Sequence, residues 1–260
     1  EHCFRVDKSF FLFFVGYGCS KYNLSCSFFY LQKRMWLQNF VTIFLLLPVT
    51  VLATSGTFGL DVSQPYTSKQ WSCLSTTTNR TWGVVRSWHS YGGFDTNAPA
   101  TLSAAKTAGL TMDVYLFPCF TKDPKAQATD MVNKLSSSSW NSVWIDVETN
   151  PSTGCGWSKN FTANCQFLQT MITSLTSTGT AVGVYSSHFE WGAVMGTQCE
   201  IANHLPLWYA RYDSVGANCE DYKTMPFGGW LRAFAKQYSD HGDAKATKCG
   251  FKGADMNVIC

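Results

Sequence analysis

The sequence predicts an α/β fold, specifically an irregular TIM-like β/α barrel. From Thr57 onward, short β-branched or aromatic runs recur at roughly 25- to 35-residue intervals, with helix-like segments between several of them. This alternation is typical of a parallel sheet or barrel, and single α/β barrels commonly take about 250 residues. Because no linker, low-complexity tract or internal repeat follows Gly56, we expect one domain.

Eight strands are expected. They are residues 57–62, 82–88, 112–117, 142–147, 181–185, 205–210, 231–238 and 254–259.

Fewer helices than strands are expected. The clearest are residues 99–108, residues 124–135 with Asp123 as the N-cap, and residues 161–175 with apolar side chains at helical spacing. After about Ala193 the helical pattern fades, so we expect loops between the last strands.

The N-terminal region is expected to lie outside the barrel domain. Residues 1–34 contain no Met and are interpreted as a non-native upstream segment; residues 35–55, with an apolar run followed by small residues, are expected to be a signal peptide. A transmembrane anchor is the alternative, but a span needs about 20 apolar residues and this run is shorter and contains Pro48. The single barrel domain is therefore assigned to residues 56–260, and we expect it to be secreted or to lie in the endolysosomal lumen.

Cysteine usage agrees with secretion. Eight cysteines follow residue 56, without close pairs or zinc-like spacing, and we expect up to four disulfides that staple the barrel; buried free thiols of a cytosolic protein are the alternative. The pairing stays open, although Cys155 with Cys165 and Cys249 with Cys260 could each close a local loop.

Composition and charge exclude some functions. The chain is 45% apolar and only 14% charged, which is far from the composition of a disordered protein. Its formal charge of +3 comes from the first 53 residues, so the remaining body is near neutral. A neutral body without a basic cluster argues against nucleic acid or an anionic membrane as the main partner, and favours a neutral ligand.

Acidic residues end two of the expected strands. Asp146 and Glu148 alternate along a strand, so their side chains point to the same face about 6 to 7 Å apart, and Asp61 ends the first strand. Glycoside hydrolysis needs a protonated acid beside an ionised partner, and crowding of like charges raises one pKa. A solvated strand end, a salt-bridged pair or a metal site are the alternatives.

Four fragments carry a resemblance to a known family. The sequences GLDVSQ from Gly59, WIDVE from Trp144, LWYA from Leu207 and KQYS from Lys236 occur in the order found in the family 25 glycoside hydrolases, lysozymes with an irregular β/α barrel. The chain resembles that family from Gly59 to Asn257. The additional cysteines depart from the bacterial pattern and suggest a secreted, eukaryotic-type member.

The resemblance implies roles for the acids. Glu148 falls on the general acid, Asp146 on the residue that orients or stabilises the reacting acetamido group, and Asp61 on the acid of the first strand; Asp255 is a looser match to a late Asp that lines the pocket. The implied activity is that of a 1,4-β-N-acetylmuramidase, with retention through the acetamido group of the substrate. Peptidoglycan is the expected partner, the protein is expected to be a monomer without stable membrane insertion, and no cofactor or metal is expected.

Aromatic residues at other strand ends are candidate sugar platforms, with two amides as candidate hydrogen-bond partners, although each could equally belong to the core. These substrate-binding candidates are Tyr115, Tyr185, Trp208, Tyr209, Gln237, Tyr238 and Asn257.

Two other functions remain as alternatives. A family 18 chitinase also uses a carboxylate pair on the fourth strand, but its motif has further acids, and Trp144 occupies the position two before Asp146. A catalytically silent carbohydrate-binding protein would be supported by a missing acid, and all the expected acids are present.

Overall fold

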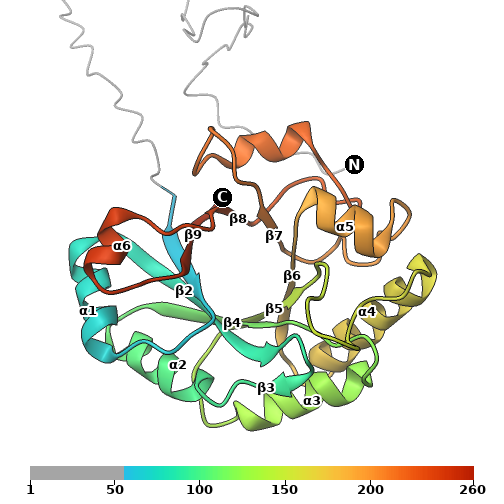
Figure 1. The fold of residues 1–260 in the computed structure, drawn as a ribbon, viewed down its shortest axis with the longest axis horizontal. Coiled ribbons are helices and arrows are strands. Elements are labelled where there is room, and N and C mark those ends of the chain that lie inside the picture. The colour runs from blue at the N-terminus through green and yellow to red at the C-terminus, as the bar shows by residue number, and fades with distance from the viewer. Residues whose placement is uncertain (1–55) are drawn as a thin grey trace, which may run out of the picture. The chain divides into compact units, whose positions relative to one another are not determined.

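The computed structural model describes residues 56–260. The expected upstream segment, residues 1–34, and the expected signal peptide, residues 35–55, lie outside the described residues. The described chain forms a closed β barrel with helices around its outside (Figure 1).

All eight predicted strands are present, with modest shifts at their ends. They are β1 (Phe58–Val62), β2 (Arg80–His89), β4 (Thr111–Leu116), β5 (Ser142–Asp146), β6 (Ala181–Ser186), β7 (Leu207–Ala210), β8 (Ala235–Ser239) and β9 (Ala254–Ile259). The order around the sheet is β1-β9-β8-β7-β6-β5-β4-β2, and pairing of β1 with β2 closes the barrel.

The barrel departs from a fully parallel one at β9, which runs antiparallel to both β1 and β8. The connection from β8 to β9 contains only the five-residue helix α6 (Ala244–Lys248), and a parallel crossover normally needs a longer helical return. As a consequence, the first residues of β9 lie at the rim where the other strands end. A two-residue strand that the sequence did not predict, β3 (Gly93–Phe94), pairs with the end of β2.

The three predicted helices are confirmed as α2 (Ala98–Thr107), α3 (Pro124–Lys134) and α4 (Phe161–Thr176). Asp123 caps α3 as expected, since its side chain accepts from the backbone N–H of Ala126. Two further helices were not predicted individually, α1 (Ser68–Thr77) and α5 (His188–Met195). Beyond α5 there are only a 3-10 helix, η1 (Cys219–Thr224), and α6, so the helices do fade. No helix among residues 56–260 is long and apolar enough to cross a bilayer.

The barrel interior is filled below its rim by three indoles. The rings of Trp82, Trp144 and Trp208 contact one another edge to face, with centroids 5.8 to 6.4 Å apart. Asp113, also buried, accepts the indole N–H groups of Trp82 at 2.9 Å and Trp144 at 3.0 Å. These three indoles and Asp113, called the indole plug below, thus fill the interior with buried side chains.

Glycine makes room for this plug. A Cβ atom added to Gly183 on β6 would lie 2.4 Å from the ring of Trp144, and one added to Gly59 on β1 would lie 2.7 Å from that of Trp82. Because such contacts are shorter than any real Cβ contact, the indoles depend on glycine at both positions.

Four disulfides staple the barrel, as the sequence predicted. They join Cys73 to Cys249, Cys119 to Cys155, Cys165 to Cys199, and Cys219 to Cys260. The local loops considered from the sequence, Cys155 with Cys165 and Cys249 with Cys260, are not formed. The bonds instead join neighbours in space, such as α1 and the end of α6.

We predict that Gly183→Ala lowers the free energy of unfolding by about 1–3 kcal/mol, because the new methyl group displaces the Trp144 ring from a filled interior. Urea denaturation measures the change. Gly156→Ala is the control, since nothing lies within 4 Å of the position that its new methyl group would take, and it should change stability by less than about 0.5 kcal/mol. Equal losses in both variants would contradict the role given to Gly183.

Candidate active site

The four acids singled out in the sequence lie together at one rim of the barrel. Asp146 ends β5 and Glu148 follows it on the same face, while Asp61 on β1 is paired in register with Asp255 on β9. The antiparallel direction of β9 brings Asp255 to this rim, because the strand begins there. Their charges act on one another, since Asp61 and Glu148 both raise the pKa of Asp255.

Two amides hold the carboxylate of Asp61. Gln237 donates through Nε2 at 2.8 Å and Asn257 through Nδ2 at 2.7 Å, both to Asp61 Oδ2. The carbonyl of Gln237 accepts the hydroxyl of Tyr185 at 2.6 Å, and that of Asn257 accepts the indole N–H of Trp208 at 2.9 Å. Asp61 is therefore fixed by a network that extends over four further strands.

The aromatic candidates divide into two groups. Tyr115, Tyr185 and Trp208 face the barrel interior, and Trp208 is only 2% exposed, so it supports Asn257 and cannot be an open sugar platform. Tyr209 and Tyr238 pack against the outer core between strands and helices.

Tyr238 is not brought to the acids. Because Gln237 faces inward, alternation turns its neighbour Tyr238 outward, where it lines a separate surface hollow with Arg80 and Asp243. Tyr209 also points outward; its hydroxyl donates to Asp221 and one edge of its ring borders the cavity beside Glu148.

Burial raises the pKa of each acid at the rim. It raises the pKa of Glu148 to about 7, with the charges of Glu190 and Asp61 as further causes. Burial likewise raises the pKa of Asp61 to about 6, against the hydrogen bonds from Asn257 and Gln237, and that of Asp255 to about 8. Glu148 can therefore hold a proton up to about neutral pH.

Asp146 is the least exposed of the four acids at the rim. Burial raises its pKa well above the usual range, and the charges of Glu148 and Asp61 raise it further. Its Oδ1 is buried and has no hydrogen-bond partner within residues 56–260. A buried acceptor without a partner is costly, so a donor from a bound molecule would be favourable there.

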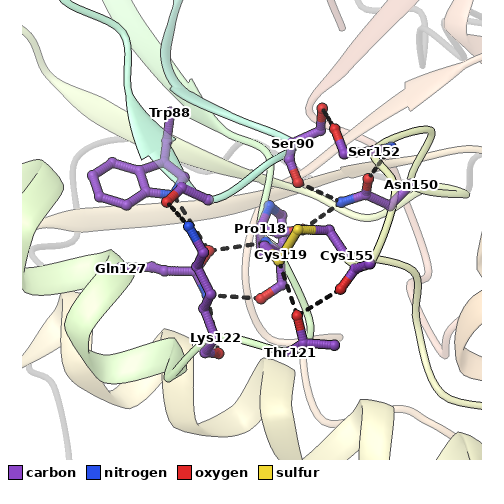
Figure 2. The surroundings of a disulfide bond; sticks show 12 residues. Trp88, Ser90, Pro118, Cys119, Thr121, Lys122, Gln127, Asn150, Ser152 and Cys155 are labelled. Atoms are coloured by element: carbon purple, nitrogen blue, oxygen red, sulfur yellow. Dashed lines mark hydrogen bonds between the residues drawn. A yellow bond between two sulfur atoms is a disulfide. The ribbon is translucent and has the colours of Figure 1, made fainter.

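The chain that follows Glu148 is anchored on both sides. The indole N–H of Trp157 donates to the carbonyl of Glu148 at 2.8 Å, and Asn150 Nδ2 donates to the carbonyls of Ser90 at 2.8 Å and Pro118 at 2.9 Å. Figure 2 shows Asn150 beside the disulfide that joins this loop to the end of β4. These contacts hold the backbone at Glu148 in place.

Gln127 supports the other half of that disulfide. Its side chain exchanges two hydrogen bonds of 2.9 Å with the backbone of Cys119 and accepts the indole N–H of Trp88 at 3.3 Å (Figure 2). The ends of β2 and β4 are thereby fixed beside the loop.

A cavity of about 480 Å³ opens beside Glu148. Tyr185, the first turn of α5 and the connection from β7 to β8 form its other walls. Phe189, which is 74% exposed, and Tyr212, which is half exposed, present aromatic rings there. A ring of this kind beside an acid is suited to stacking on a sugar.

Sequence reasoning missed Phe189, Glu190 and Tyr212, all of which line this cavity. A signal for the first two was present, because Ser187 is followed three residues later by Glu190, the pattern of a helix N-terminus. Tyr212 lies in an irregular connection and carried no such signal. Within the described part of the chain, no group of three or more His, Cys, Asp or Glu side chains is arranged to hold a metal ion.

The fold and the rim define the class of protein. A β/α barrel whose interior is plugged below, with acids and aromatic rings where its strands end, has the architecture of a barrel glycoside hydrolase.

Comparisons with known proteins identify the family. A family model described as "Lysozyme-like protein 1" matches residues 53–238. The "Probable GH family 25 lysozyme 2" of Dictyostelium discoideum is 33% identical over 224 residues, which cover 85% of this chain and 99% of that protein. The "Probable GH family 25 lysozyme 3" of the same organism is 33% identical over 223 residues, 84% of this chain, but the match spans only 44% of its length.

The fold is that of a solved family member. The structure of a family GH25 lysozyme from Aspergillus fumigatus superposes with a TM-score of 0.63 at 17% identity, covering 79% of this chain and 94% of that one. The chain belongs to the family 25 glycoside hydrolases, the lysozyme family that its four sequence fragments resembled.

We predict that Asp255→Asn makes the protein more stable at pH 8 but not at pH 4. A carboxyl whose pKa is raised in the folded state stabilises the fold below its unfolded pKa, and this contribution is lost as the pH rises toward about 8. Removing the charge should therefore add on the order of 1 kcal/mol at pH 8, allowing for partial exposure. Urea unfolding at both pH values measures it, and a loss of stability at pH 8 would contradict the account.

Proposed function

We propose that this protein is a lysozyme that hydrolyses the β-1,4 bond from N-acetylmuramic acid to N-acetylglucosamine in bacterial peptidoglycan. The observation that carries the proposal is that Asp146, which ends β5, and Glu148, two residues later, are close enough for the charge of Glu148 to raise the pKa of Asp146 after burial, while Glu148 lines a cavity large enough for a sugar. Membership of the lysozyme family supports the same reaction.

Glu148 is the proposed general acid. Its raised pKa, about 7, keeps the carboxyl protonated in mildly acidic solution, so that it can donate to the glycosidic oxygen as the bond breaks. The carboxylate that remains can then accept a proton from the water that completes hydrolysis.

Asp146 is proposed to orient the acetamido group of the substrate. Its unpartnered Oδ1 can accept the N–H of that group, which turns the acetamido carbonyl oxygen toward the anomeric carbon. That oxygen forms a bond to the carbon as the leaving group departs, and water later displaces it, so the configuration is retained. This route requires no nucleophile from the protein.

Asp61 and Asp255 are proposed to form the opposite wall of the sugar site. Both amide donors of Asp61 bind its Oδ2, so Oδ1 is the oxygen that can accept a sugar hydroxyl. Burial raises the pKa values of Tyr115 and Tyr185, and the nearby charges of Asp61, Asp146 and Glu148 raise them further, together with Tyr212 in the case of Tyr185.

Phe189 and Tyr212 are proposed to bind the glycan beyond the reacting sugar. Their exposed rings border the cavity on the side of α5 and the connection from β7 to β8. They replace Trp208 and Tyr238 among the aromatic residues proposed to contact sugar.

Localisation and assembly are part of the proposal. Four disulfides form in an oxidising compartment, so we propose that the protein acts after secretion or in the endolysosomal lumen, as a monomer, on glycan strands of the cell wall.

We predict that Glu148→Gln lowers the release of soluble muropeptides from purified bacterial cell walls by about 10²- to 10⁴-fold, the range expected for loss of a general acid. The wild-type activity should fall about tenfold per pH unit above the pKa of Glu148, about 7. Glu200→Gln, an exposed acid in the connection between α5 and β7, is the control and should retain activity.

Product analysis distinguishes the alternatives. New reducing ends on N-acetylmuramic acid identify a muramidase. Cleavage of chitin oligomers without release from cell walls would indicate a chitinase, and binding without cleavage of either would indicate a carbohydrate-binding protein.

We predict that Phe189→Ala raises KM for glycan strands by about 3- to 10-fold with little change in kcat, because loss of a stacking ring costs on the order of 1 kcal/mol of binding. Steady-state kinetics on soluble glycan fragments measure this. Leu231→Ala removes an equally apolar side chain that is 95% exposed and is not among the residues that line the cavity, and it should not change KM. An unchanged KM in Phe189→Ala would contradict the platform.

A further inference from the structure

A further acid is fixed directly beside the general acid. Glu190 lies in the first turn of α5 and lines the same cavity as Glu148. Its Oε2 accepts two hydrogen bonds from Thr149, one from the backbone N–H at 2.6 Å and one from the hydroxyl at 2.7 Å. Because Thr149 directly follows Glu148, these two hydrogen bonds to Glu190 fix the backbone next to Glu148.

Glu190 is itself held by a rigid element. Ser187 caps α5 and accepts the backbone N–H of Glu190 at 3.1 Å, and the next residue, Trp191, is buried in the core. A negative side chain in the first turn of a helix is also favoured by the helix dipole. Both partners of Oε2 are donors, which suits an ionised carboxylate, since it can only accept.

The surroundings of Glu148 contain little to neutralise Glu190. Arg211 lines the cavity, but its guanidinium lies 2.7 Å from Asp213 and 3.6 Å from Asp221. Arg86, at the end of β2, pairs with Asp95 at 3.0 Å. The other titratable groups facing this region are Asp61 on β1, Tyr115 on β4, Asp146 on β5, Tyr185 on β6, His188 on α5, Tyr209 on β7, Tyr212 after β7, Tyr222 in η1 and Asp255 on β9.

We propose that Glu190 is a positioning residue for the reaction: its carboxylate fixes the backbone at Thr149, and its negative charge keeps the proton on Glu148 until the glycosidic oxygen takes it. The inference rests on the proposed function in one respect, namely that Glu148 is the proton donor. It adds a second requirement, that the donor is kept protonated by an acid on a different element.

The electrostatics agree with the geometry. After burial, the charge of Glu190 is the largest cause that raises the pKa of Glu148, and it also raises the pKa of Asp146. Removing that charge should lower the pH at which Glu148 loses its proton.

The test separates charge from hydrogen bonding. In Glu190→Gln the amide oxygen can still accept from Thr149, but the charge is lost. We expect the alkaline midpoint of the kcat/KM profile for cell-wall hydrolysis to fall by about one pH unit, so that activity drops about tenfold at pH 8 and less than about twofold at pH 5.

Two further variants and one control variant refine the result. Glu190→Ala also removes the acceptor, so the same shift should be accompanied by a fall in kcat at every pH. Thr149→Val removes the hydroxyl donor and keeps the charge of Glu190, so the alkaline midpoint should not fall. Glu200→Gln makes the same change of charge at an exposed position in the connection between α5 and β7, and should leave the profile unchanged.

A purely structural role would give a different pattern. If Glu190→Gln lowers kcat equally at all pH values, or leaves the midpoint where it is, the proposal is overturned. A second measurement does not depend on activity: the titration of the Glu148 carboxyl, followed by carbon NMR in the wild type and in Glu190→Gln, should show the same downward shift. If the protein cleaves no cell wall, the proposed function fails, while the NMR titration still decides whether Glu190 holds the proton on Glu148.

Discussion

One carboxylate oxygen, Asp61 Oδ2, joins the strands on one side of the barrel. It accepts hydrogen bonds from Gln237 on β8 and Asn257 on β9, and these amides are oriented in turn by Tyr185 on β6 and Trp208 on β7. Directly or through the two amides, this buried oxygen thus links residues of five strands. Because an amide that donates to a carboxylate must present its carbonyl elsewhere, the tyrosine and the indole are needed to complete the arrangement.

The indole plug below this network explains the behaviour of the acids above it. Three tryptophans and Asp113 are packed together in the buried interior beneath the acids. Burial is consequently the first cause of the raised pKa of Asp61, Asp146, Glu148 and Asp255 alike, and the repulsion among their charges adds to it. The same packing that stabilises the barrel therefore prepares a proton donor at its rim.

The sequence predicted those parts of the site that depend on local periodicity. Alternation along the expected strand predicted that Asp146 and Glu148 share a face. Asp255 was identified only through the family resemblance, because nothing in the sequence of its strand indicates that the strand runs antiparallel to its neighbours. Alternation also separates Gln237, which donates to Asp61, from its neighbour Tyr238, which faces away from the acids. Glu190 and the disulfide partners depend on how distant elements pack, and periodicity carries no information about that.

The disulfides offset the loss of folding stability that the buried acids of the site cause. A buried acceptor without a partner, as at Asp146, and four acids held above their usual pKa all oppose folding as the pH rises. Four disulfides close loops of 34 to 176 residues, and each bond of this kind typically contributes about 2–4 kcal/mol. One of them, Cys119–Cys155, joins the loops that follow β4 and β5 beside Glu148, whereas others join outer elements, such as α1 with α6 and α4 with the chain after α5. The disulfides thus supply stability that the acids at the rim do not, so an arrangement of charges that opposes folding can persist there.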